Sequence, residues 1–77
     1  MLQTFSHLIS DPEILNGKPI IKGTRISVEI VLEWLANGAS FEDMLAMHPR
    51  LTLEALQQAV RYAAQLNRNE IMIAIKH

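Results

Sequence analysis

The most informative absence from this sequence is cysteine, which excludes a disulfide framework and a metal site built on thiolates. No apolar run exceeds a few residues, so no segment is predicted to cross a membrane as a helix. The first ten residues lack the charged start, long apolar core and cleavage site of a secretory signal. We therefore expect a soluble, cytoplasmic protein that has no membrane partner.

Residues that carry enzyme chemistry are also missing. There is no cysteine nucleophile, no serine sits in a nucleophile elbow, and the three histidines lack metal-ligand spacing. Asp11 and Glu13 could form an acid/base pair, but both lie in a predicted turn, where carboxylates are common. We expect no enzymatic activity, no metal and no cofactor.

Charge of either sign is scarce, since 19% of the 77 residues are charged and the net charge is −1. No overall field would therefore draw nucleic acid to the protein. The charges are segregated, however, because Lys18, Lys22 and Arg25 occur with no acidic residue among them, whereas every formal charge from Ile26 to His48 is negative. This patterning is compatible with a local basic face or with ordinary solvated surface.

What the sequence does contain is apolar residues, at 49%. A chain of this length forms one domain and buries only roughly 60% of its unfolded surface. So high an apolar content favours sharing some of that surface with a partner, and we expect a homodimer. The single domain, 1–77, is divided into a β/turn arm (1–27), a three-helix core (28–67) and a tail (68–77).

The arm is predicted to contain two short strands and two turns. His7–Ser10 and Pro19–Ile21 have strand character, and Asn16-Gly17 and Lys22-Gly23-Thr24 are turn sequences. Together these glycines, lysines and the Gly-Thr pair are residue types that are common in phosphate-binding loops. The spacing argues against one, because five residues separate the two glycines and no Gly-Lys-Thr follows the second. Two turns around a short strand are the better interpretation.

Three helices follow the arm. The first is bounded by Ser27 as N-cap and by Gly38, and the second begins at a capping box formed by Ser40 and Asp43 and ends before Pro49. The third is predicted from Leu53 to Asn67 after Thr52 as N-cap, with an inner face of Leu53, Leu56, Val60, Ala63 and Ala64.

Two apolar surfaces are candidate interfaces. The first helix is apolar around most of its circumference, so it is either central or shared with a second subunit, through Val31, Trp34 and Leu35. In the tail, Ile71, Ile73 and Ile75 alternate, which favours a strand, although a continued third helix is also compatible. A strand of this kind is expected to dock on the N-terminal strand of its own or a neighbouring subunit, or on a partner protein.

The second and third helices, joined by the short segment HPRL, match the helix-turn-helix pattern. In DNA-binding versions the second helix of the pair enters the major groove. The predicted outer face carries glutamine and arginine, which suit base edges, and Arg50 and Lys22 would contact phosphates. Such residues are equally typical of an ordinary helix surface. The predicted DNA-binding residues are Gln57, Gln58, Arg61, Gln65, Arg50 and Lys22.

From Asp11 to Leu66 the sequence resembles domain-of-unknown-function family 433, a group of small bacterial proteins. The resemblance rests on Asp11-Pro12-Glu13, Gly17-Lys18-Pro19, Gly23-Thr24-Arg25, and on the later Pro49, Leu51 and Tyr62-Ala63. This chain departs from the family pattern in having Asn16 in place of a glycine and Ser27 in place of a frequent proline.

The resemblance implies a VapB-like antitoxin encoded beside a PIN-like ribonuclease, and a helical, homeodomain-like core with a short N-terminal β element. Two hypotheses follow. In the first, the protein is an antitoxin-type regulator that binds promoter DNA and neutralises the ribonuclease. In the second, it is a protein-interaction module that does not bind DNA.

Overall fold

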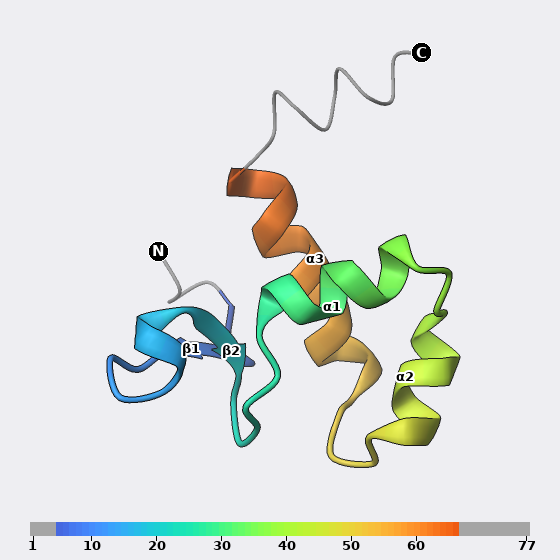
Figure 1. Ribbon diagram of the computed structural model, residues 1–77, viewed down its shortest axis with the longest axis horizontal. Helices are drawn as coiled ribbons and strands as arrows, with labels where there is room; N and C mark the ends of the chain where they lie inside the picture. The colour runs from blue at the N-terminus through green and yellow to red at the C-terminus, as the bar shows by residue number, and fades with distance from the viewer. Residues whose placement is uncertain (1–4, 67–77) are drawn as a thin grey trace.

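The computed structural model describes residues 5–66 and contains two short strands, one 3-10 turn and three α-helices (Figure 1). A β-hairpin lies on one side, α1 crosses α3 in the middle, and α2 lies on the other side. The predicted mainly helical fold with a short N-terminal β element is confirmed, whereas the predicted C-terminal strand lies outside the described residues. The elements are β1 (Leu8–Ser10), η2 (Leu15–Gly17), β2 (Pro19–Ile21), α1 (Val28–Ala36), α2 (Phe41–Met47) and α3 (Leu53–Leu66).

The arm is an antiparallel pair of strands whose register places Leu8 opposite Ile21. The chain reverses through a left-handed turn, because Leu15, Asn16 and Gly17 have φ values of 51°, 58° and 83°. Asparagine and glycine adopt this region readily, which confirms the predicted turn. A leucine in this left-handed region is unusual, and residue propensities do not predict the positive φ of Leu15.

All three helices begin at the predicted caps. The Ser27 and Thr52 hydroxyls accept backbone N–H groups, at 3.0 Å and 3.1 Å, in the first turns of α1 and α3. Ser40 and Asp43 form the complete capping box of α2. The pKa of Asp43 is held below its usual 3.8. The main cause is the hydrogen bond that its carboxylate accepts from the Ser40 backbone N–H, and the second cause is its interaction with the Ser40 side chain. Negative charge is also favourable in the first turn of a helix.

The core is built around α3, on which α1, α2 and β1 all pack. Val31 of α1 is fully buried against it, so its predicted role in a shared surface is wrong. Leu53, predicted on the inner face, is 48% exposed at the start of α3. The buried apolar side chains are Phe5, Leu8, Ile20, Ile21, Val28, Val31, Met44, Leu51, Ala55, Leu56, Ala59 and Ala63.

Most of the apolar circumference of α1 is covered within the chain itself. Trp34 and Leu35 are half-buried against the core, and the Trp34 ring stacks on His48 at a centroid separation of 5.0 Å. This stack ties the end of α1 to the end of α2. Ile30 is the large apolar side chain that α1 leaves exposed, at 36%. The breadth of the apolar pattern therefore reflects a central helix packed on several sides.

Candidate functional site

The turn after β2 is held by the residues of the Gly23-Thr24-Arg25 motif. The Ile21 backbone N–H donates to the Ile26 carbonyl at 2.9 Å, which closes the turn. The Thr24 hydroxyl donates to the Ile21 carbonyl at 2.7 Å and accepts the Ile26 N–H at 3.0 Å. Gly23 has φ +78°, a conformation that other residues rarely adopt. Glycine and threonine are therefore explained by the turn, and the Arg25 side chain is not.

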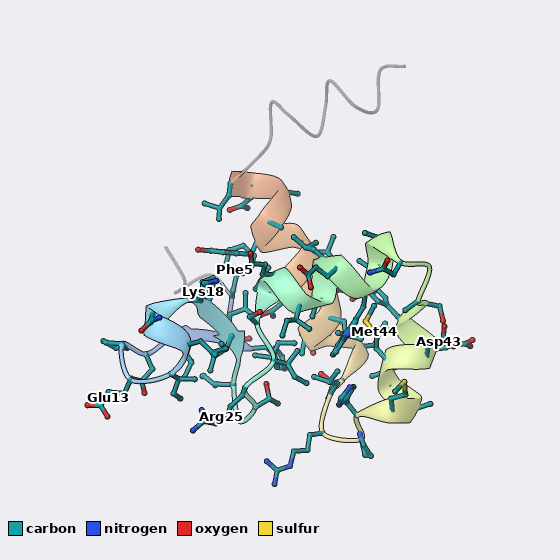
Figure 2. The ribbon with its side chains drawn as sticks, in the orientation of Figure 1. Phe5, Glu13, Lys18, Arg25, Asp43 and Met44 are labelled. Carbon is teal, nitrogen blue, oxygen red and sulfur yellow. The ribbon has the colours of Figure 1, made fainter. Side chains whose placement is uncertain are left out.

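Arg50 connects this turn to the segment between α2 and α3. Its Nη1 donates to the Gly23 carbonyl at 3.1 Å, across 27 residues of sequence. Both turns lie at the lower edge of Figure 1, and Figure 2 shows Arg25 projecting outward there. Arg25 forms no hydrogen bond or ion pair within residues 5–66. We refer to Gly23, Thr24, Arg25, Pro49 and Arg50 as the turn–turn edge.

Two grooves flank the turn–turn edge, and Thr24, Arg25 and Arg50 line both of them. The hairpin-side groove, of about 420 Å³, is otherwise lined by Gly23 and by three isoleucines, Ile9, Ile14 and Ile20. The α2-side groove, of about 620 Å³, is completed by Ile26, Met47, His48 and Pro49.

No carboxylate lines either groove among the described residues. The nearest acidic part of the arm is the loop between the strands, and Figure 2 shows Glu13 projecting from its far edge, away from Arg25. Met47 is 75% exposed, which is unusual for a large apolar side chain. The edge therefore combines two cationic side chains with apolar walls on both sides.

A second candidate surface is the outer face of α3. Gln57, Arg61 and Gln65 are exposed and follow one another at four-residue spacing, so they lie in a row along the helix. None of the three side chains forms a hydrogen bond or ion pair within the part of the chain that the structure describes. This part of the predicted DNA-binding face is exposed as expected.

Gln58, however, is not on that face, and its prediction as a DNA-contacting residue is wrong. Its side chain is 7% exposed, and its Oε1 accepts the His7 backbone N–H at 2.8 Å. Its Nε2 donates to the Ser6 hydroxyl at 3.3 Å. The N-terminal arm crosses this side of α3 and needs a partner for its backbone, and a glutamine supplies one.

The remaining predicted cations have separate positions. Lys18 forms an exposed ion pair with Glu29 at 3.0 Å, on the rim of a third hollow of about 360 Å³ between the hairpin, α1 and α3. Figure 2 shows Lys18 and Arg25 on opposite edges of the hairpin. Lys22 is exposed, and its backbone N–H donates to the His7 carbonyl at 2.9 Å. Pro19 opens β2, opposite Ser10.

The remaining predictions concern the tail, metal binding and membrane crossing. Ile71, Ile73 and Ile75 lie outside the described residues. Within residues 5–66, no group of three or more histidine, aspartate or glutamate side chains is placed to hold a metal ion. In the same residues, no helix has the length and apolar character that crossing a bilayer requires.

Comparison with known proteins gives a consistent assignment. The family model described as protein of unknown function (DUF433) matches residues 9–63. Uncharacterized protein y4eO of Sinorhizobium fredii is 43% identical over 54 residues, which are 70% of this chain and 24% of that protein. The chain thus spans about a quarter of the length of this curated relative.

A solved structure agrees in fold. The crystal structure of a DUF433 member protein from Anabaena variabilis superposes with a TM-score of 0.74 at 28% sequence identity, over 99% of this chain and 75% of that one. The Gly17-Lys18-Pro19 and Gly23-Thr24-Arg25 motifs both fall within the matched region. The chain belongs to the DUF433 family of proteins of unknown function.

Proposed function

We propose that this protein is a non-enzymatic, antitoxin-type regulator that binds DNA through α3 and acts in the cytoplasm. The observation that carries the proposal is the exposed row of Gln57, Arg61 and Gln65, whose side chains have no partner within residues 5–66. Glutamine can bond adenine through two hydrogen bonds, and arginine can bond guanine in the same way. An α-helix presenting such a row fits the major groove of DNA.

The position of Lys22 relative to α3 is fixed by hydrogen bonds. The hairpin that carries it is attached to α3 by two consecutive hydrogen bonds, from Lys22 N–H to the His7 carbonyl and from His7 N–H to Gln58. We propose Lys22, which is exposed, as a phosphate contact that accompanies base reading by α3. Arg50, also predicted to contact phosphate, is partly engaged with Gly23 and is not needed for this proposal.

The test is binding of a fluorescent duplex from the region upstream of the protein's own gene, followed by anisotropy at several salt concentrations. If Arg61 reads a base, Arg61→Ala should weaken the free energy of DNA binding by about 1–3 kcal/mol and relax the preference for sequence. Lys22→Ala should weaken binding to all sequences and reduce the salt slope by about one. Lys18→Ala is the matched control, because it removes a lysine from the other edge of the hairpin. If both test variants bind like the parent, the proposed DNA interface is wrong.

The antitoxin role extends this proposal, and its support is the family resemblance carried by the Gly17–Arg25 segment. A PIN-like ribonuclease encoded beside the gene is the proposed target. Co-expression of the two proteins should give a stable complex in which ribonuclease activity is suppressed. An adjacent ribonuclease that stays fully active with an excess of this protein would contradict the role.

Self-association is the second part of the proposal, with the protein acting as a homodimer. Several exposed apolar side chains favour an interface, including Ile30 at 36% and Leu66 at 55%. Trp34 and Leu35 remain partly exposed and can contribute at the edge of such an interface. Sedimentation equilibrium should give twice the 8.7 kDa chain mass. A clean monomer at high concentration would refute the homodimer.

The alternative is a protein-interaction module that does not bind DNA. The exposure of Met47 and Leu53 at opposite ends of the α2–α3 connection favours it, since apolar side chains at such a position suit a protein partner better than a phosphate backbone. This function would be identified if the parent protein bound no duplex DNA and substitution of Met47 or Leu53 weakened its binding to a partner protein.

A further inference from the structure

We propose that the turn–turn edge binds an extended peptide segment of a partner protein, in which an acidic side chain is flanked by apolar side chains two residues away on either side. This surface is distinct from the α3 row proposed to contact DNA. Its assignment does not depend on DNA binding, because it rests on different residues and a different chemistry.

The acidic position follows from charge. Arg25 has no hydrogen-bonding or ionic partner within residues 5–66, and it lines the same two grooves as Arg50. The guanidinium of Arg50 carries five N–H donors, so the bond to the Gly23 carbonyl leaves others available. Two neighbouring arginines with no carboxylate in the described lining are suited to a carboxylate ligand, which accepts paired hydrogen bonds from a guanidinium.

The flanking apolar positions follow from the walls. On one side of the arginines lie Ile9 and Ile14, and on the other lie Ile26 and Met47. Along an extended peptide, alternate side chains point to the same face at a spacing of about 7 Å. A carboxylate held between the arginines would therefore direct the side chains two residues before and after it toward the two grooves.

The same walls distinguish a peptide from nucleic acid at this edge. A DNA backbone presents phosphates and sugars and would leave the apolar grooves without complementary groups. Met47, 75% exposed, is a flexible side chain that can adapt to an apolar partner. The combination of cations and apolar walls is thus matched best by a protein segment that has both features.

The proposal can be tested with a defined set of peptides. Fluorescein-labelled dodecapeptides with Gly-Ser flanks would carry a central apolar–Ser–X–Ser–apolar unit, where X is aspartate, glutamate, asparagine or lysine and the apolar residue is leucine, valine or phenylalanine. Binding to the full 77-residue chain would be measured by anisotropy. The acidic peptides should bind, and replacing the acid by asparagine or the apolar residues by serine should weaken binding.

Variants of the protein locate the site. Arg25→Gln and Met47→Ser should each weaken the acidic peptides by about tenfold or more, since a lost charge-assisted hydrogen bond or apolar contact is of that order. Lys18→Gln, at the other edge of the hairpin, should bind as the parent does. Because both altered side chains are exposed, melting followed by circular dichroism should show that the variants remain folded.

The outcomes separate this proposal from the proposed function. Acidic peptides that bind no better than the asparagine peptides, or that bind both variants like the parent, would overturn it. If Arg25→Gln and Met47→Ser both lose binding to duplex DNA while the parent binds no peptide, the turn–turn edge is a nucleic-acid surface. That result would also overturn the peptide proposal. Arg61→Ala that loses DNA but retains the acidic peptides would support two separate surfaces.

Discussion

Replacing Gln58 by alanine tests the structure most directly, because the sequence alone assigns this residue to the surface. The substitution removes the acceptor of the His7 N–H, a hydrogen bond of 2.8 Å, and a longer bond to Ser6. Leaving this partly buried backbone donor without a partner costs about 1–3 kcal/mol. The side chain is 7% exposed, so its packing against the arm is lost as well. We expect about 2 kcal/mol of destabilisation, which lies within this range.

Thermal unfolding followed by circular dichroism measures the effect. In a domain of this size, about 2 kcal/mol corresponds to a decrease in Tm of roughly 8–16 °C. The matched control is Gln57→Ala, which alters the neighbouring, exposed glutamine and should change the free energy of unfolding by less than about 0.5 kcal/mol. If the two variants melt at the same temperature, the arm is not anchored to α3 through Gln58 and the reasoning fails.

Three further outcomes are expected. Ser27→Ala should lower the free energy of unfolding by about 1 kcal/mol in urea titrations, because the α1 N-cap is lost, and an unchanged midpoint would contradict the cap. Truncating a fully buried tryptophan costs about 3–5 kcal/mol. Trp34→Ala should cost less than this, because the ring is only half-buried, where it stacks on His48. A Tm equal to that of the parent would show that the stack contributes nothing. The pKa of Asp43 is lowered in the folded state, so its contribution to stability is present above the unfolded value of 3.8 and is lost as pH falls through the folded value. The Tm difference between the parent and Asp43→Ala should therefore shrink on acidification, and a constant difference would refute the role of its charge.

Much of the fold follows from local rules that the sequence states directly. The caps at Ser27, Ser40 and Thr52 and the stop before Pro49 were predicted correctly, because each depends on residues within one helical turn. The turn at Asn16-Gly17 was predicted for the same reason. Interactions of this range are decided by neighbouring residues, so a linear pattern contains the information.

The candidate sites show where that information stops. Val31 and Gln58 were placed on the wrong surfaces because their burial depends on contacts with α3 and with the arm. Helical periodicity separates an apolar face from a polar one, but it does not indicate which polar side chain another segment will cover. A polar residue is buried wherever the chain brings a backbone group that needs its hydrogen bond.

By itself, the sequence determined the three helices, the two short strand segments with their turns, the absence of thiol chemistry and the identity of each motif. Tertiary structure alone decided that Arg25 and Arg50 line the same two grooves, since the hydrogen bond from Arg50 to the Gly23 carbonyl spans 27 residues. It also decided that Lys18 pairs with Glu29 at the opposite edge. The physical reason is that a surface is defined by proximity in space, and proximity between distant segments is set by how the hairpin and the helices pack around α3.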